Sequence, residues 1–290
     1  MIIKRLYIFL IFLVFLAGCQ PGVDRPVKVM TFNIRYGLVD DGQNSWQYRK
    51  TFVADVIKYH QPGIVGLQEA LGFQLAYLDS SLDHYTWFGA ARDDGKQQGE
   101  YTAILYDSRR FKMLRNSTFW LSETPDKPSQ SWDAALKRTV TWAEFEDSKT
   151  SKRFFYFNTH FDHRGDTARY ESAKLLKRKI TEIAKNNYII LTGDFNCDPL
   201  DEPYKHLTSK DIPDSEILFD TRLISKSGHY GPNSTFTGFD LNADPSEPID
   251  FIFCGDKITI KKHATISDTF DGKLPSDHYP ILVELTLNYN

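Results

Sequence analysis

Cysteine is scarce in this sequence. Only three occur in 290 residues, and two of them, Cys197 and Cys254, lie in the body of the chain. That number allows at most one disulfide there, and an oxidising compartment would permit the two to pair. Each of them sits beside a strongly apolar segment, where a small thiol packs well. We therefore expect two free, buried thiols.

The sequence also lacks a basic excess. It has 35 Lys and Arg against 38 Asp and Glu. Loss of residues 1–18 would remove Lys4 and Arg5 and leave 33 against 38, a net charge of −5. Proteins that grip long stretches of nucleic acid usually carry a strong positive charge. The balance weakens, without excluding, a role on polymeric DNA.

A bilayer-spanning segment is missing at the N-terminus, although an apolar run is present. Residues 6–16 carry no charge, but a spanning helix needs ~20 residues, and the preceding Lys4 and Arg5 make this run typical of a secretion signal. It ends in Leu16-Ala17-Gly18-Cys19, which resembles the lipobox of bacterial lipoproteins. The resemblance implies cleavage before Cys19 and its acylation, so that lipid chains hold the protein on a membrane surface. An ordinary signal peptide containing a chance cysteine is the alternative.

Nothing in the composition divides the rest of the chain. Residues 20–26 form a short polar tether, and residues 27–287 show no repeat, low-complexity linker or composition break. The mature length is normal for one sandwich domain. We expect a signal peptide at 1–18, a lipidated tether at 19–26 and one domain at 27–290. The residue after the cysteine is Gln20 and not aspartate, a pattern that resembles lipoproteins sorted to the outer membrane in Gram-negative bacteria.

Short apolar or alternating runs, rich in β-branched and aromatic residues, predict eight strands. They are Val27–Arg35, Ile64–Glu69, Tyr101–Tyr106, Arg138–Phe145, Arg153–His160, Tyr188–Asp194, Ile249–Cys254 and Tyr279–Leu287. Helical spacing of apolar residues predicts helices at Trp46–His60 and Thr167–Asn186. Successive strands mixed with a few helices predict an α+β fold with antiparallel pairing, not a doubly wound parallel sheet.

Several of these strands carry a polar, metal-capable group at one end. The strands that finish in such a group lead to Asn33, Glu69, His160 and Asp194, whereas Asp250 and Asp277-His278 precede theirs. If all these ends meet at one rim, the sheets run partly antiparallel and the rim gathers acids, imidazoles and an amide. Rigid strand ends are a good place to hold such groups in fixed geometry.

Two of these positions suggest phosphoester chemistry. Glu69 is the first choice as ligand for Mg²⁺, which prefers carboxylate oxygens, although a lone strand-end glutamate is more commonly a surface residue. In Gly193-Asp194-Phe195-Asn196, the glycine permits a tight turn. Asp194 can then act as a base on water, and Asn196 can donate to a phosphoryl oxygen. A lone Asp-x-Asn would more commonly be an Asx-turn.

Six segments, taken in order, resemble the endonuclease/exonuclease/phosphatase, or DNase-I-like, superfamily. They are Thr-Phe-Asn33-Ile-Arg, Gly-Leu-Gln-Glu69, Asn-Thr-His160-Phe-Asp162-His, Gly-Asp194-Phe-Asn196, Ile-Asp250-Phe-Ile-Phe and Ser-Asp277-His278-Tyr-Pro. The resemblance spans nearly the whole mature chain. It implies a sandwich of two mixed, largely antiparallel β-sheets flanked by helices, and a Mg²⁺- or Mn²⁺-supported attack of water on phosphorus.

The resemblance also implies roles for individual residues. Glu69 would bind the metal, with Asn33 and Asp277 near it. Catalytic roles would fall on Asp194, Asn196, His160, His278 and Asp250: Asp194 would activate water and Asn196 would contact the phosphate. The two histidines would stabilise the pentacovalent state, and Asp250 would orient His278 in the correct tautomer.

Further residues are expected next to the site. Arg35 and Arg138 could reach phosphate oxygens with a bidentate fork, and a surface salt bridge is the equal alternative. Asp162 and His163 follow His160 and are expected to shape the pocket floor. Phe236 could offer its ring to a base or sugar, or belong to the core.

These observations lead to one functional hypothesis and two alternatives. We expect an exported, membrane-anchored, monomeric phosphoesterase with no protein partner, acting on a nucleotide, sugar phosphate, lipid headgroup or nucleic acid. A secreted endonuclease or exonuclease is the first alternative. A non-catalytic binding lipoprotein is the second, but a degenerate member would be expected to lose Glu69, Asp194 or His278, and all three are present.

Overall fold

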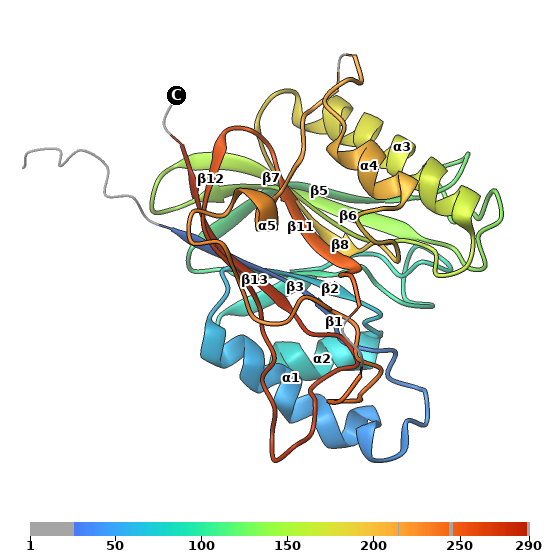
Figure 1. Ribbon diagram of the computed structural model, residues 1–290, viewed down its shortest axis with the longest axis vertical. Helices are drawn as coiled ribbons and strands as arrows, with labels where there is room; N and C mark the ends of the chain where they lie inside the picture. The colour runs from blue at the N-terminus through green and yellow to red at the C-terminus, as the bar shows by residue number, and fades with distance from the viewer. Residues whose placement is uncertain (1–25, 214, 244–245, 289–290) are drawn as a thin grey trace, which may run out of the picture.

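Two β-sheets stack face to face, and helices cover their outer faces (Figure 1). This computed structural model describes residues 26–213, 215–243 and 246–288. The expected signal peptide and Cys19 lie outside the described residues. Within the described part of the chain, no helix has the length and apolar character needed to cross a bilayer.

The first sheet has seven strands and mixed pairing. In spatial order they are β10 (His229–Tyr230), β12 (Ile258–Thr265), β13 (Ile281–Leu287), β1 (Val27–Asn33), β2 (Ile64–Gln68), β4 (Ile104–Asp107) and β3 (Tyr85–Phe88). The central strand β1 is parallel to β2 and antiparallel to β13. Its side chains alternate: Val27 and Val29 enter the core between the sheets, while Met30 and Phe32 pack toward the helices. Asn33 therefore ends the strand on the inner face.

The second sheet has six strands. In order they are β5 (Phe111–Trp120), β6 (Thr139–Asp147), β7 (Lys152–His160), β8 (Tyr188–Asp194), β11 (Asp250–Cys254) and β9 (Phe219–Asp220). Only β7 and β8 run parallel; β8 and β11 are antiparallel. The two sheets thus form the predicted mixed sandwich.

Helices lie against both sheets. They are η1 (Gly42–Asn44), α1 (Trp46–His60), α2 (Gly72–Ser81), α3 (Asp166–Ala184), α4 (Glu202–Thr208) and α5 (Thr221–Ile224). Helices α1 and α2 cover the seven-stranded sheet, and α3 and α4 cover the six-stranded sheet (Figure 1). The helices pack on the sheets through apolar side chains. Helix α1 buries Val53, Val56 and Ile57, and α3 buries Leu176 and Ile180.

The sequence-based elements hold, with shifts and omissions. Helix α1 has the predicted bounds, whereas β4 begins at Ile104 rather than Tyr101, because Tyr101 makes only isolated bridges to Ala70 and Ala91. Strand β5 was not predicted, since it is a sheet edge whose exposed polar residues hide the alternation. Strands β3, β9, β10 and β12 and helices α2, α4 and α5 were also missed. Both cysteines are free and buried, as expected.

Candidate active site

The polar strand ends converge at one end of the sandwich. Asp194, the last residue of β8, lies between two register partners, His160 at the end of β7 and Asp250 at the start of β11. On the facing sheet, Asn33 ends β1 beside Gln68, the last residue of β2. Sequence-distant groups are thus gathered on two facing rims.

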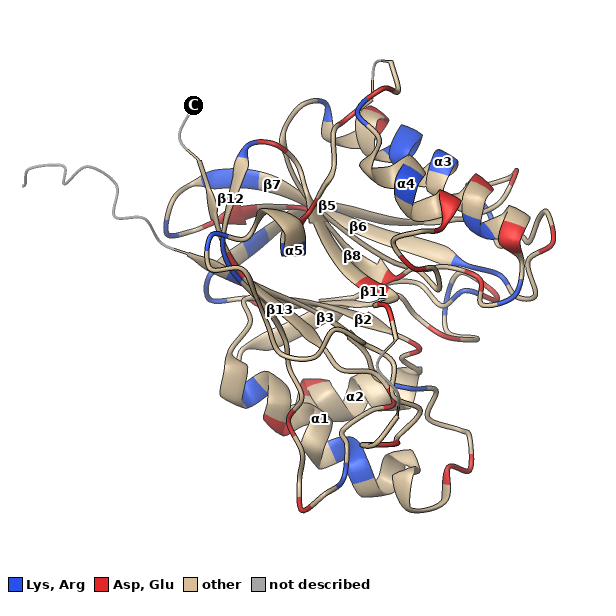
Figure 2. Cartoon of the chain, viewed as in Figure 1, with Lys and Arg blue, Asp and Glu red and all other residues tan. Residues whose placement is uncertain are grey.

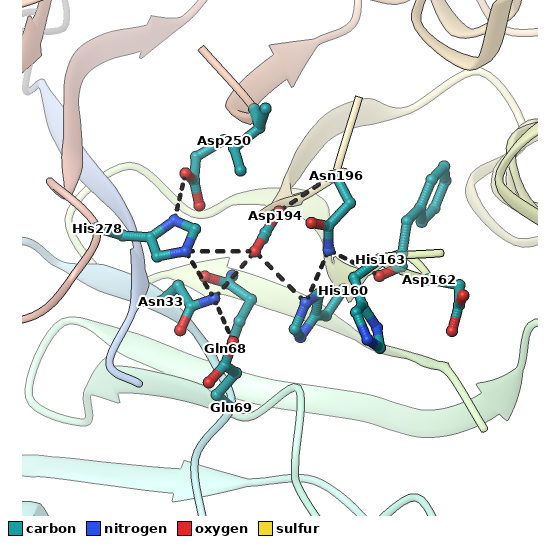
Figure 3. Close-up of polar contacts among 12 residues, drawn as sticks. Asn33, Gln68, Glu69, His160, Asp162, His163, Asp194, Asn196, Asp250 and His278 are labelled. Carbon is teal, nitrogen blue, oxygen red and sulfur yellow. Dashed lines mark hydrogen bonds and ion pairs between the residues drawn. The ribbon is translucent and has the colours of Figure 1, made fainter. Parts of the chain in front are cut away.

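Asn33 links the two sheets (Figure 3). Its Nδ2 donates to Glu69 Oε1 at 3.0 Å and to Asp194 Oδ2 at 2.9 Å, and lies 3.5 Å from His278 Nε2. Its Oδ1 accepts from the Arg35 backbone N–H at 3.0 Å, which orients the amide. In this arrangement Asn33 acts as a donor that holds two carboxylates together, and its place as a metal ligand stays a prediction.

Glu69 is held in a strained conformation beside this amide. It follows β2 with φ of 59°, in the left-handed region that non-glycine residues rarely adopt. Its Oε2 accepts from the Tyr36 backbone N–H at 2.7 Å. Arg35 and Asn196 also have positive φ. Strain of this kind directs side chains toward the site and is typical of functional positions.

A polar network between the two sheets holds Gln68, the residue that precedes Glu69. Gln68 Nε2 donates to Asn158 Oδ1 at 2.6 Å, between the sheets. A Cβ at Gly66 would collide with Asn158 Oδ1 and Thr192 Oγ1. The glycine of the Gly-Leu-Gln-Glu segment is therefore required by the close approach of the second sheet.

The turn after β8 positions Asp194 and Asn196. The Asn196 backbone N–H donates to Asp194 Oδ1 at 3.0 Å, and Asn196 Nδ2 donates to Phe161 O at 3.0 Å. Burial, together with the charge of Asp250, raises the pKa of Asp194 to about 7. A carboxylate with this pKa is well placed to exchange a proton near neutral pH.

The two histidines have opposite electrostatic environments. Burial alone would lower the pKa of His278, but Asp250, Asp194 and Asp277 outweigh it and raise that pKa well above the ordinary value. His278 is therefore a cation that donates from Nδ1 to Asp250 Oδ2 at 2.8 Å.

Burial lowers the pKa of His160 well below its ordinary value, and Arg138 and Arg92 add to this. His160 is therefore neutral. Its Nε2 accepts from Asn196 Nδ2 at 3.1 Å and so places the proton on Nδ1.

Two overlapping groups among the described residues could hold a cation. They are Glu69, His160 and Asp194, and Asp194, Asp250 and His278; within each group the ligand atoms lie within 4.8 Å of one another. Because a protonated His278 cannot ligate a metal ion, the first group is the better candidate. Glu69 and Asp194 supply the oxygens that Mg²⁺ and Mn²⁺ prefer, and the buried acids provide negative charge for a cation to neutralise. These residues fit a divalent ion. Asp277 belongs to neither group; its Oδ2 lies 3.4 Å from Arg35 Nη1.

A cleft of about 370 Å³ is lined by Glu69, His160, Asp194, Asp277 and His278. The others at its wall are Arg35, Glu100, Leu136, Arg138, Asn196, Phe236, Ile249 and His163. Phe236 packs edge-on against His278, with ring centroids 5.1 Å apart, and remains 45% exposed. Arg138 is buried, and its Nη1 has no partner among the described residues.

Two of the expected residues are held differently from the expectation. Asp162 does not line the cleft. Its carboxylate accepts from the Gly165 backbone N–H at 2.9 Å and pairs with Arg138 at 3.4 Å, so it holds Arg138 from behind. Arg35 does line the cleft, but it forms a bidentate pair with Asp41, at 3.0 Å for each bond.

Glu100 was missed by sequence reasoning. It is buried in the cleft wall, pairs with Arg92 at 2.7 Å, and lies 4.0 Å from His160 Nδ1. Burial raises its pKa to about 7. It stands in a loop without strand periodicity, but it precedes the apolar run that ends in β4. An acid just before an apolar strand, the signal that pointed to Asp250, could have found it.

A buried acid-rich cleft at the rim of a two-sheet sandwich is the arrangement of a metal-supported phosphoesterase. The sequence model of the Endonuclease/Exonuclease/phosphatase family matches residues 30–278. The chain belongs to this family, whose members are phosphoesterases and nucleases that depend on divalent metals.

Solved structures of similar proteins agree with this assignment. A family protein from Bacteroides vulgatus is 38% identical, with 91% of this chain and 100% of that chain covered and a TM-score of 0.86. A mannosyl-6-phosphatase from Bacteroides thetaiotaomicron is 36% identical, with 90% and 99% covered and a TM-score of 0.85. Human nocturnin is 24% identical over 90% of this chain, which spans 64% of the nocturnin sequence.

Proposed function

We propose that this protein is a lipid-anchored, extracytoplasmic phosphatase that hydrolyses small phosphate monoesters, foremost sugar phosphates, with Mg²⁺ or Mn²⁺. The observation that carries the reaction is the meeting of Asn33, Glu69, Asp194 and His278 across two sheets. The observation that supports the substrate class is the similarity to a mannosyl-6-phosphatase over nearly all of both chains.

The chain's own residues divide the work. Asp194, with its pKa near 7, takes a proton from the attacking water as the water oxygen bonds to phosphorus. The P–O bond to the leaving group breaks, the leaving oxygen takes a proton from His278 Nε2, and His278 regains one from Asp194, 3.9 Å away. The His278 cation donates a hydrogen bond to an oxygen on which negative charge develops, and Asp250 keeps His278 protonated and oriented. Asn196, whose amide donates to Phe161 O and His160 Nε2, holds His160 at the wall of the cleft. A divalent cation held by Glu69 would supply charge neutralisation and polarise the phosphoryl group.

The cleft suits a small substrate. Its volume of about 370 Å³ lies in the ordinary range for small-molecule sites. Phe236 and Leu136, both partly exposed, offer apolar contact for a sugar ring on the leaving-group side. The net charge of −3 offers no general attraction for a nucleic-acid polyanion.

A substrate panel tests the proposal. Purified enzyme with Mg²⁺ or Mn²⁺ is assayed on hexose 6-phosphates, p-nitrophenyl phosphate, bis-p-nitrophenyl phosphate, nucleotides and plasmid DNA, with Asp194→Asn as the inactive control. We expect the highest kcat/KM on a hexose phosphate, abolished by EDTA. Faster cleavage of DNA would instead support a nuclease, and no turnover on any substrate would support a binding protein.

The anchor is tested separately. Cys19→Ser should move the protein from the membrane fraction to the soluble extracytoplasmic fraction, because acylation of this thiol and the new amino group would no longer occur. A Cys197→Ser variant serves as the matched control and should stay with the membrane. Sedimentation of Cys19→Ser with membranes as before would contradict lipidation.

A further inference from the structure

The chain enters the sandwich at the end opposite the catalytic cleft. Strand β1 begins at Val27 and ends at Asn33, and its seven residues span roughly 20 Å at ~3.3 Å per residue. Strand β8 runs in the same sense, from Tyr188 to Asp194. We call the end of the sandwich that carries Pro26 and Val27 the entry end.

The entry end is basic, although the chain as a whole is acidic. It comprises residues 26–28, 58–64, 82–85, 107–112, 146–153, 185–188, 254–258 and 284–288. Lysine and arginine number ten there: Lys28, Lys58, Arg109, Arg110, Lys112, Lys149, Lys152, Arg153, Lys185 and Lys257. The acids number six: Asp83, Asp107, Glu146, Asp147, Asp256 and Glu284. Figure 2 shows Lys and Arg gathered where β1 and β7 begin.

Part of this charge is not neutralised within the protein. Lys112, Lys149 and Lys185 are exposed, and none forms an ion pair with another described residue. A hollow of about 870 Å³ opens beside Pro26 and is lined by Lys28, Lys58, Arg109, Arg110 and Lys149, with three acids. Of these cations, Lys58, Arg109 and Arg110 form ion pairs with Asp55, Asp107 and Asp147. The hollow is large enough for more than one phosphate-sized group. Positive groups around a concave surface are complementary to a layer of anions.

The length of chain ahead of Pro26 limits how far this end can stand from a membrane. Cys19 is separated from Pro26 by six residues. A segment from 19 to 26 spans at most ~25 Å when fully extended. The tether alone would allow the domain several orientations relative to the membrane, so a further interaction is needed to set one of them.

We propose that the entry end is a membrane-facing surface that rests on the anionic lipid headgroups of the bilayer holding the anchor. This inference rests on the lipid anchor proposed above. It directs the catalytic cleft away from that bilayer, at the far ends of β1 and β8. The substrate is then a water-soluble phosphoester, and the lipids of the anchoring membrane are excluded.

Vesicle binding without the anchor tests the surface by itself. The chain from residue 19 with Cys19→Ser is sedimented with vesicles of phosphatidylcholine alone or with 30% phosphatidylglycerol. We expect binding only to the anionic vesicles, and release in ~0.5 M NaCl, where the Debye length falls to a few ångströms. Equal binding to both vesicle types, or to neither, would overturn the inference.

A charge-matched pair of variants locates the surface. Lys112→Gln, Lys149→Gln and Lys185→Gln together should weaken anionic-vesicle binding at least ~10-fold. The control Lys127→Gln, Lys174→Gln and Lys205→Gln removes the same charge elsewhere and should bind as the parent. Equal loss in both variants would mean non-specific attraction and would overturn the assignment.

The orientation has its own readout. On vesicles carrying the full acylated protein, p-nitrophenyl phosphate added in solution should be hydrolysed at the rate of the unanchored protein, while phosphatidylglycerol and phosphatidic acid in the same vesicles stay intact. Hydrolysis of those lipids would overturn the inference. Loss of p-nitrophenyl phosphate hydrolysis in the unanchored protein too would instead contradict the proposed function.

Discussion

His278 Nδ1 donates to Asp250 Oδ2 at 2.8 Å, and Asp250 is itself the register partner of Asp194 across β8 and β11. One buried carboxylate, that of Asp250, therefore changes the protonation of two neighbouring groups, His278 and Asp194. It holds His278 as a cation, and burial together with the like charge of Asp250 raises the pKa of Asp194 to about 7. The same residue thus shifts the pKa of the base, Asp194, and the pKa of the charged donor, His278.

Replacing Asp250 should affect both groups. We expect Asp250→Asn to lower kcat by roughly 10²-fold or more, because His278 loses the charge that keeps it protonated. Since Asp250 raises the pKa of His278, the alkaline fall in activity should move to lower pH in the variant. The pH profile of kcat measures this. Asp256→Asn, two residues beyond the opposite end of β11, is the control. An unshifted alkaline limb would remove Asp250 from this role.

Glu69 should govern the metal. Glu69→Gln keeps the shape but removes the charge, and we expect Mn²⁺ affinity to fall at least ~10-fold, the minimum cost of disturbing a metal site. Titration calorimetry measures this without turnover, and Glu123→Gln, an exposed glutamate, should bind as the wild type. Dialysis against EDTA should abolish activity in the wild type and Mn²⁺ should restore it. Unchanged affinity in Glu69→Gln would contradict the ligand assignment.

Arg49 ties together the segments that carry the site. Its buried guanidinium donates to Ile34 O at 2.6 Å, Pro275 O at 3.1 Å, Arg35 O at 3.1 Å and Asn44 O at 2.9 Å. These carbonyls flank Asn33 on one side and Ser276-Asp277-His278 on the other. Arg49 is therefore a positioning residue, since it touches neither the cleft nor the reacting atoms.

Loss of this guanidinium should loosen the site. We expect Arg49→Met to reduce the free energy of unfolding by about 3 kcal/mol, because buried carbonyls lose a charged donor. Mn²⁺ affinity and kcat should fall together. Arg49→Lys should restore part of the stability and less of kcat, because an ammonium cannot reach four carbonyls arranged for a planar fork. A variant as stable and active as the wild type would contradict the role.

His263 should make the fold sensitive to acid. It is buried, and its Nδ1 lies 3.0 Å from His229 Nδ1. Burial, with the nearby His229 and Arg222, lowers its pKa to about 3. Because the folded pKa lies below the unfolded value, the unfolded state binds more protons between pH 6.5 and 3, and stability falls as pH falls through that window.

His263→Gln should weaken this dependence. Between pH 6.5 and 4.5, protonation of this histidine in the unfolded state should lower the free energy of unfolding of the wild type by about 2–3 kcal/mol. The fall in the variant should be smaller by that amount. Urea unfolding at the two pH values measures the difference. His84→Gln, in a loop at the entry end, is the control and should behave as the wild type. Equal slopes for wild type and His263→Gln would show that another group carries the acid sensitivity.

Local sequence was informative wherever a buried strand ended in a polar residue. The β1, β7, β8 and β11 segments are apolar runs whose burial needs no knowledge of the partner strand. Their terminal residues, Asn33, His160, Asp194 and Asp250, therefore stood out. Edge strand β5 and the loop residue Glu100 carried no such periodicity, because exposed edges and loops need not alternate.

The sequence by itself determined an α+β fold whose strand ends carry acids, amides and imidazoles, because hydrophobic periodicity and turn chemistry are local; the two-sheet sandwich followed from the family resemblance of its motifs. Only the tertiary structure decided which atoms meet. The contact of Asn33 with Glu69 and Asp194, the buried cage around Arg49 and the opposite pKa shifts of His160 and His278 all depend on distances between residues far apart in the chain. Burial and electrostatic interaction act through space, and no pattern along the chain records them.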